Sequence, residues 1–445
     1  MSPRLSQDEQ NTDQDVPEKI MPKQEHSSAA ITPEVIAHAE LLAGISFTAS
    51  ERTVIAETIG QQIAIFAQRI KAGELPNDLA PASTFKAMPA GRSPDRATSV
   101  GDPLRITAKV GALPDSDSAI AFSPLTHLAT WFRRGELSST RLTKIYLQRI
   151  RRSNPTLKCV ITITEDVALK QARKADTERA AGIDLGPLHG MPYAAKDIID
   201  TANIPTTWGA EPFKDHVPNH NAWVVEKLKA AGAVLIAKTS VGALAYGDIW
   251  FGGTTKNPWN LNQGSSGSSA GSASGTAAGL FAFSLGTETY GSIVSPCMRC
   301  GATGLRPTFG RVPRSGVMSL CWSLDKIGPI CRSVADTALV LAVINGMDNS
   351  DPSSVDEPFN FDANQNARGL RVGWNPSWFA DAPSSDRQVL DHLRDAGCEL
   401  VEISLPDLPY QTLLVPLFAE AAAAFESLSR SNRDDELSWQ APEAW

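Results

Sequence analysis

GSSGSSAGSASGTAAGLFAFSLGTETYGSIVSP, residues 264–296, is the stretch that decides how this sequence is interpreted. Its first half is rich in glycine and serine, which is typical of a flexible linker. The run then continues into an apolar segment, 276–285, and ends in a second glycine–serine pair, Gly291-Ser292. A linker has no need of that second half. We therefore interpret the stretch as part of a folded site, in which small residues allow tight turns around serine side chains.

The bulk composition describes an ordinary globular chain. Of its 445 residues, 42% are hydrophobic and 20% are charged, which is enough apolar material for a sizeable core. The net charge of −8 argues against a dedicated nucleic-acid-binding protein, because such proteins carry a basic surface. We therefore expect no direct contact with nucleic acid.

The cysteines and the N-terminal residues indicate a reducing compartment. Six cysteines are scattered along the chain, and the first 30 residues lack the apolar stretch of a signal peptide. We therefore expect a cytoplasmic protein, and no segment is long and apolar enough for a membrane span. Cys297 and Cys300 form a CxxC pair, but without a second pair or a nearby histidine the sequence predicts no metal site and no cofactor.

The chain divides into four predicted segments. They are a disordered polar tail (1–28), a helical region (29–75), an extended connector rich in Pro, Gly and Ser (76–118) and one α/β domain (119–445). Within the helical region, Thr48-Ala-Ser-Glu51 has the form of a capping box. The isoleucines that follow recur at helical spacing, so the capping box predicts the start of an amphipathic helix that ends near Gly73.

The domain shows an alternating pattern of helices and strands. Helices are predicted at 125–134, 138–152, 166–179 and 221–232, and strands at 159–164, 191–195 and 233–239. Alternation of this kind predicts an α/β fold with a mixed sheet between helices.

Lys196 is the first candidate for chemistry, because it ends a short apolar strand. Partial burial would lower its pKa and make the neutral amine available as a base. The alternative is an ordinary surface lysine paired with Asp197. Ser268 and Ser292 lie in the two glycine–serine turns, where backbone N–H groups can point at a shared anion. For these the alternative is a serine-rich turn or a phosphate loop, although no Gly-Lys-Ser/Thr sequence closes a Walker motif.

Histidine gives little support for a serine–histidine triad. His189 is the one histidine inside these motifs, and residues 264–267 miss the G-x-S-x-G elbow by one residue. A serine activated by lysine is the better-supported arrangement.

Four motifs together resemble the amidase signature family. They are GPLHGMPYAAKD (186–197), SGSSAGSASGTAAG (266–279), LGTETYGSIVSP (285–296) and CGATGLRPT (300–308), in the order that the family has. The resemblance covers roughly 120–445 and is specific because four separate motifs coincide. It implies a mixed central sheet covered by helices on both faces, with an N-terminal helical extension in this chain.

The resemblance also implies roles for individual residues. Ser292 would be the nucleophile, Ser268 a bridging serine after a cis Gly267–Ser268 bond, and Lys196 the base, all three in one hydrogen-bonded chain. Counting back from Ser292 selects Ser268 rather than Ser265 as the bridging serine. The implied oxyanion hole consists of the backbone N–H groups of Thr289, Tyr290, Gly291 and Ser292.

The chain departs from the family pattern at several positions. Tyr290 replaces a glycine, and we expect it to narrow the pocket or to change what lies above it. Glu288 and Val294 stand where the family has Asp and Arg, and Arg299 is the expected partner of Glu288. The sequence ends where family members continue, so we expect a domain that is incomplete at its C-terminal end.

Three functions compete at this stage. The first is a hydrolase that cleaves the C–N bond of a small carboxamide through an acyl-serine, with a homodimer as a possible assembly. The second is the glutaminase (amidase) subunit of a tRNA-dependent amidotransferase, and the third is an inactive truncated family member. The sequence does not identify the amide.

Overall fold

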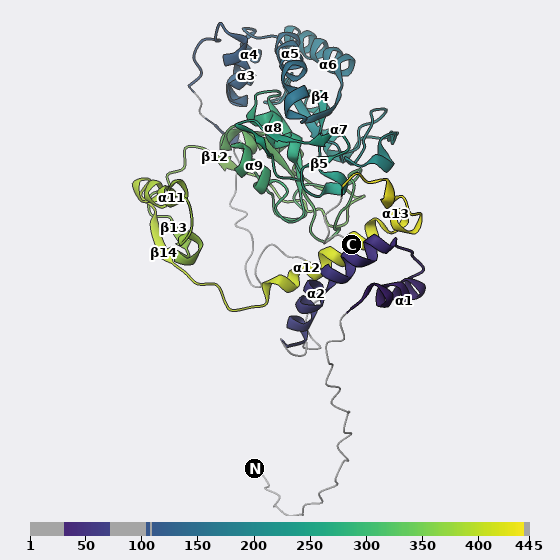
Figure 1. Cartoon of the computed structure of the whole chain (residues 1–445). Coiled ribbons are helices and arrows are strands. Elements are labelled where there is room, and N and C mark those ends of the chain that lie inside the picture. The colour runs from purple at the N-terminus through teal and green to yellow at the C-terminus, as the bar shows by residue number, and fades with distance from the viewer. Residues whose placement is uncertain (1–30, 72–103, 107–108, 440–445) are drawn as a thin grey trace, which may run out of the picture.

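A six-stranded mixed sheet lies at the centre of the computed structural model, which describes residues 31–71, 104–106 and 109–439 (Figure 1). In spatial order its strands are β10 (Thr303–Gly304), β11 (Lys326–Cys331), β9 (Phe283–Glu288), β3 (Pro192–Lys196), β4 (Val234–Thr239) and β2 (Val160–Ile163). Strand β3 is parallel to both β9 and β4, and the outer pairings are antiparallel. The predicted α/β class with a mixed sheet is confirmed.

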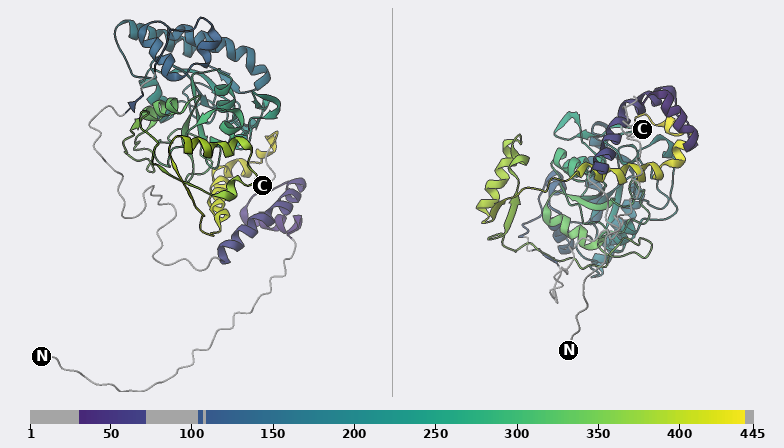
Figure 2. Two further views of the ribbon diagram at one scale, coloured as in Figure 1. Left: turned by 90° about the vertical axis from the view of Figure 1, so that its left-hand side faces the viewer. Right: turned by 90° about the horizontal axis from the view of Figure 1, so that it is seen from below.

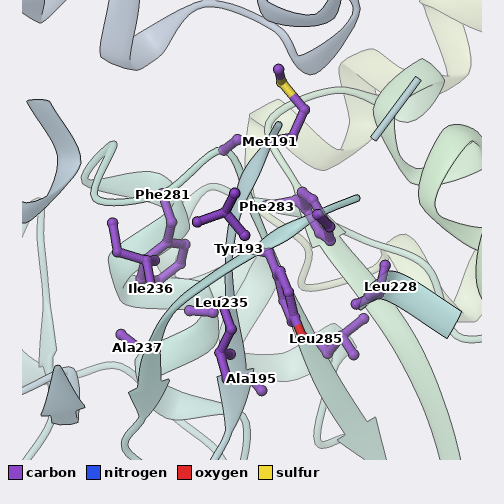
Figure 3. Packing of buried hydrophobic residues seen from close by; sticks show 14 of the residues in the cluster. Met191, Tyr193, Ala195, Leu228, Leu235, Ile236, Ala237, Phe281, Phe283 and Leu285 are labelled. Atoms are coloured by element: carbon purple, nitrogen blue, oxygen red, sulfur yellow. The ribbon is translucent and has the colours of Figure 1, made fainter. Parts of the chain in front are cut away.

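The central strands are buried along their whole length. Every residue of β3, β4 and β9 is buried, and successive side chains of a strand point to opposite faces. Both faces of the sheet are therefore covered, which explains why these strands appear in the sequence as short continuous apolar runs. Figure 3 shows the packing between them, where the rings of Tyr193 and Phe283 stack with centroids 5.4 Å apart.

Helices of the domain surround this sheet, and α5, α6, α8 and α10 pack directly on it. The helices are α3 (Asp117–Phe122), α4 (Leu125–Arg134), α5 (Ser139–Leu157), α6 (Glu165–Ala180), α7 (Trp223–Ala230), α8 (Ala270–Ala277), α9 (Val294–Cys300) and α10 (Val334–Ile344). Among the described residues four two-stranded pairs lie outside the sheet, one of them in the C-terminal part. The other three are β1 (Leu104–Arg105) with β12 (Phe361–Asp362), β5 (Ile249–Trp250) with β6 (Gly253–Thr254), and β7 (Lys256–Asn257) with β8 (Asn260–Gly264).

The predicted elements of the domain are confirmed, with one clear difference in length. Helix α5 continues to Leu157, five residues past the predicted end, and includes Pro155. The side chain of Asn154 accepts hydrogen bonds from the N–H groups of Cys159 (2.9 Å) and of Val160 (2.8 Å), the first residue of β2. This tertiary anchor holds the last turn, although an Asn-Pro pair favours a turn in the sequence.

The N-terminal region forms a helical hairpin of α1 (Pro33–Ala43) and α2 (Ala49–Lys71). The capping box is confirmed, because the N–H of Thr48 donates to Glu51 (2.6 Å) and the N–H of Glu51 to the Thr48 hydroxyl (3.3 Å). Arg52 holds the two helices together through both carboxylate oxygens of Glu40 (2.6 and 2.7 Å). The predicted tail 1–28 and residues 76–103 of the predicted connector lie outside the described residues.

The C-terminal part adds a small β-α-β unit and two helices. Strands β13 (Arg371–Trp374) and β14 (Glu399–Glu402) are parallel and joined through α11 (Ser384–Asp395), to one side of the central sheet in Figure 1. Helices α12 (Leu414–Ala424) and α13 (Glu426–Arg430) follow and return to the α1–α2 hairpin, as both views of Figure 2 show. Short 3-10 helices complete the described chain: η1 (Glu211–Phe213), η2 (Ala243–Ala245), η3 (Pro376–Phe379), η4 (Tyr410–Leu413) and η5 (Asp434–Glu436).

Candidate active site

Lys196 is the last residue of β3 and is fully buried, with 0% of its surface exposed. Its amine lies 2.8 Å from the hydroxyl of Ser268, 2.7 Å from that of Thr287 and 3.2 Å from that of Ser269. The carbonyl oxygen of Thr287 is 3.4 Å away. Because Lys196 is buried, the alternative of an ordinary surface lysine is wrong. An amine surrounded by hydroxyl groups can exchange a proton with them.

Burial sets the protonation state of this lysine. Loss of solvation lowers the pKa of Lys196 to about 7, against a smaller opposing effect of the Asp325 and Glu288 carboxylates. Asp197 is not a partner of this amine, because its side chain forms a buried ion pair with Lys238 (3.2 Å). Close to neutral pH, therefore, a large share of the Lys196 amine is unprotonated.

Ser268 follows a cis peptide bond at Gly267–Ser268, as the resemblance implied. It lies two residues before α8, with its side chain buried beside Lys196. A Cβ atom on Gly267 would lie 1.7 Å from the carbonyl oxygen of Gly247, so only glycine fits there. The glycine-rich segment is thus a packed turn and not a linker.

Ser292 lies in the turn between β9 and α9 and is partly exposed. Its carbonyl oxygen accepts the N–H of Ser269 at 3.1 Å, which holds this turn against the residue after Ser268. In the described part of the chain, however, no hydrogen bond joins the Ser292 and Ser268 side chains. Of the expected three-residue chain, the Lys196–Ser268 link is present and the Ser268–Ser292 link is not formed in this conformation.

The backbone of residues 289–292 leaves its N–H groups available. Among the described residues none of these four N–H groups donates a hydrogen bond to another residue. Gly291 has φ +96°, a left-handed conformation that glycine adopts without strain. Tyr290 is 75% exposed and does not line the adjacent pocket, so the first of its two expected effects, a narrower pocket, is wrong.

Glu288 ends β9 and is fully buried. One carboxylate oxygen accepts the N–H groups of Ile293 (2.8 Å) and Val294 (2.9 Å), and the other lies 3.1 Å from Arg306. The expectation that Arg299 is the partner of Glu288 is wrong. Arg306 follows β10, and the order β10-β11-β9 in the sheet brings it to Glu288, an adjacency that spacing along the chain does not reveal.

A pocket of about 410 Å³ opens beside these groups, with Thr287 and Thr289 on its wall. Much of the remaining wall is apolar. Its large apolar side chains are Ile198, Val317, Met318, Leu320, Trp322 and Ile327.

The charged groups around this pocket are already engaged. Arg314 pairs with Asp351 (3.4 Å), and Lys326 donates to the carbonyl oxygens of Thr289 and Leu324. Asp325 accepts from the Thr289 hydroxyl (2.5 Å) and from two backbone N–H groups of the pocket loop. The described wall therefore presents no unpaired charge to a ligand.

Helix α12 holds the loop that forms one side of the pocket. The carboxylate of Glu420 accepts the N–H of Ser323 at 2.8 Å and lies 3.2 Å from the sulfur of Cys321. Nothing in the sequence pattern pointed to this contact, since about 100 residues separate the partners.

The CxxC pair lies on α9, directly after the candidate nucleophile turn. Burial raises the pKa of Cys297 to about 12 and that of Cys300 to about 12, so both thiols stay protonated. Among the described residues no cluster of three or more His, Cys, Asp or Glu side chains could hold a metal ion. The described helices also include none with the length and apolarity to cross a membrane.

The sequence pattern of one protein family, described as Amidase, matches residues 141–443. This chain belongs to the amidase family. The match includes all four motifs and every residue of the site described above. The resemblance inferred from the sequence is confirmed.

Relatives with similar sequences are components of an amidotransferase. One such component of the glutamyl-tRNA(Gln) amidotransferase of Roseiflexus sp. (strain RS-1) is 42% identical over 302 residues, 65% of this chain and 62% of the relative. Its counterpart in Chloroflexus aurantiacus (strain ATCC 29366 / DSM 635 / J-10-fl) is 39% identical over 323 residues, 69% of this chain and 66% of the relative. The chain thus spans less than two thirds of the length of these curated relatives.

Solved structures form a second group of relatives. The native peptide amidase from Stenotrophomonas maltophilia superposes with a TM-score of 0.64 and 33% identity, over 72% of this chain and 74% of that one. A fatty acid amide hydrolase superposes with a TM-score of 0.66 and 25% identity, over 75% of this chain and 61% of that one. Both are amidases by name, and they share the fold that carries the site.

Proposed function

We propose that this chain is a serine amidohydrolase that cleaves the C–N bond of a carboxamide. The observation that carries the proposal is the buried Lys196 amine, 2.8 Å from Ser268, beside a turn that presents Ser292 and free backbone N–H groups. A buried neutral amine is a competent base, and a serine hydroxyl next to N–H donors is the arrangement that acyl transfer requires.

The proposed reaction runs in two halves. The Ser292 oxygen attacks the amide carbon and passes its proton to Ser268, which gives its own proton to Lys196. The N–H groups of Thr289, Tyr290, Gly291 and Ser292 stabilise the oxyanion, and the proton returns through Ser268 to the leaving nitrogen as the C–N bond breaks. Water then hydrolyses the acyl-Ser292 ester by the same route. Rotation of the Ser292 side chain toward Ser268 on substrate binding would complete the proton path, because catalytic hydrogen bonds often tighten only in the complex.

The pocket supports an uncharged amide as the substrate. A free ammonium or carboxylate group loses solvation in such a pocket and needs a partner, and the charged side chains of the described wall already have theirs. An apolar acyl or amine group fits the Met318, Leu320 and Trp322 surface instead.

A second candidate is the glutaminase component of a tRNA-dependent amidotransferase. It is favoured by the names of the relatives with 39–42% identity, which are components of such enzymes. Glutamine carries both an ammonium and a carboxylate group, so this candidate predicts ammonia release from glutamine in the presence of the partner subunits.

One assay distinguishes the two candidate functions from each other and from an inactive chain. Ammonia release is measured with hexanamide, benzamide and glutamine, the last with and without amidotransferase partner subunits, and Ser292→Ala serves as the control. Turnover of the neutral amides by the chain alone supports the amidohydrolase. Turnover of glutamine only with partners supports the second candidate. Failure of every substrate, together with no labelling by a fluorophosphonate, would contradict both.

The pH dependence of activity should follow Lys196. Its unprotonated form is the base, and burial lowers its pKa to about 7, so kcat/KM should rise with pH through about 7 and level off above about 8. A pH profile from 5 to 10 with a neutral amide checks this. A profile already flat from pH 6, or one that rises only near 10, is the result that would count against Lys196 as a buried base.

A further inference from the structure

We propose that Glu288, with Arg306, is a positioning residue that fixes the Ser292 turn for attack. This inference rests on the proposed function, because it assigns a role in presenting the nucleophile. Glu288 touches no reacting atom in the mechanism above, and acts through the backbone that surrounds Ser292.

The carboxylate closes the turn on itself. Glu288 is the last residue of β9, and its side chain accepts the N–H groups of Ile293 and Val294, the two residues directly after Ser292. Residues 289–292 therefore form a short loop that the Glu288 side chain closes, because its carboxylate binds the backbone directly after Ser292. While the N–H groups of Ile293 and Val294 are bound in this way, those of residues 289–292 donate to no other described residue.

Arg306 stabilises the charged form of the buried Glu288 carboxylate. The charged form of a fully buried carboxylate is costly unless it is paired and hydrogen-bonded. One oxygen of Glu288 serves the turn and the other lies 3.1 Å from the guanidinium of Arg306, whose side chain is 56% exposed. Val294 and the exposed Arg299 on α9 provide no such partner, so the ion pair comes from the segment after β10.

Two further contacts hold the same turn from outside. The Ser292 carbonyl oxygen accepts the N–H of Ser269, and Lys326 donates to the Thr289 carbonyl oxygen at 3.2 Å. The Ser269 contact holds the carbonyl oxygen of the peptide between Ser292 and Ile293, and Glu288 holds the N–H of that same peptide. Glu288 alone among the described side chains binds the backbone there, so its removal should loosen the nucleophile without opening the pocket.

A charge effect accompanies this geometry and gives an independent readout. Glu288 and Asp325 are the carboxylates that raise the pKa of Lys196 against the effect of burial, while Arg306 and Lys326 face Glu288. Removing the charge of Glu288 should therefore move the pH profile of kcat/KM to lower pH. A purely structural side chain would not produce that shift.

The test compares Glu288→Gln with a matched carboxylate far from the site. Asp336 is also fully buried and also accepts two consecutive backbone N–H groups, those of Leu125 (3.0 Å) and Thr126 (3.2 Å). We expect Glu288→Gln to lower kcat about 10- to 100-fold with KM changed less than about threefold, and to shift the pH midpoint downward. Asp336→Asn should cost stability and leave kcat within about twofold.

Hydrogen exchange keeps the inference testable without turnover. In Glu288→Gln the amides of Ile293, Val294 and Ser295, which are hydrogen-bonded in the wild type, should exchange at least about tenfold faster, while Asp336→Asn should leave them unchanged. Wild-type kcat and unchanged exchange in Glu288→Gln would overturn the proposal. If the wild-type chain hydrolyses no amide, the proposed function fails by itself, and the exchange result still decides whether Glu288 fixes the turn.

Discussion

Ser292→Ala is expected to lower kcat for amide hydrolysis by at least about a thousandfold, the scale typical for loss of a nucleophile. No neighbouring hydroxyl can replace it. Ser268 and Ser269 are bound to the Lys196 amine, and Ser295 is hydrogen-bonded to Ser266 at 2.6 Å. The measurement is steady-state ammonia release, with intact-mass detection of one fluorophosphonate adduct on the wild-type chain and none on the variant.

Ser295→Ala provides the control for this prediction. Ser295 lies three residues after Ser292, in the first turn of α9, and its replacement by alanine also removes one serine hydroxyl group. Its activity should stay within about threefold of wild type. Near-normal turnover by Ser292→Ala, or an adduct mapped to another serine, would contradict Ser292 as the nucleophile.

Lys196→Met is expected to lower kcat by a similar factor, because in the described part of the chain Lys196 is the base within hydrogen-bond distance of Ser268. Methionine fills most of the volume of the lysine side chain and needs no solvation, so the fold should be retained. The residual activity should also lose its rise through pH 7. The matched control is Lys238→Met, which removes a second lysine that is fully buried and leaves Asp197 without this ion pair. It should lower stability far more than it alters the pH profile.

Lys196 should also leave a signature in stability. Its pKa is about 7 in the folded chain and near the ordinary lysine value of 10.5 when unfolded. Between these values the unfolded chain binds a proton that the folded chain does not, so the free energy of unfolding should increase as pH rises from 7 to 10. The melting temperature of wild type relative to Lys196→Met should climb over that range. A constant difference would mean that Lys196 keeps an ordinary pKa.

Much of the site was predictable because its residues lie in local motifs. The strand that ends at Lys196, the glycine-rich turn of Ser268 and the turn of Ser292 are each recognisable within about ten residues. Their assembly follows from one fact of topology, that β3 and β9 are parallel neighbours. Family resemblance, rather than periodicity, supplied the pairing of Lys196 with Ser268.

The parts that escaped prediction depend on contacts between distant segments. Arg299 is nearer to Glu288 in sequence. Arg306 is its partner instead, because the sheet order β10-β11-β9 brings the segment after β10 close to the end of β9. Tyr290 was expected at the pocket, but the turn directs it to solvent. Glu420 binds the pocket loop across about 100 residues. In each case the contact depends on where the folded chain places the side chain, which the type of residue does not reveal.

The register of β3 and β9 has a consequence for how such a site can change. Lys196 and Glu288 end two strands of one hydrogen-bonded ladder, and bonded strands cannot slide past each other without breaking it. The pocket wall, in contrast, includes loop residues such as Leu320 and Trp322, held by a few contacts to α12. Substitutions in that loop can alter which amide fits while the proton path stays in place. The proposed chemistry thus depends on the sheet, whereas the proposed selectivity depends on a loop surface that substitutions can change separately.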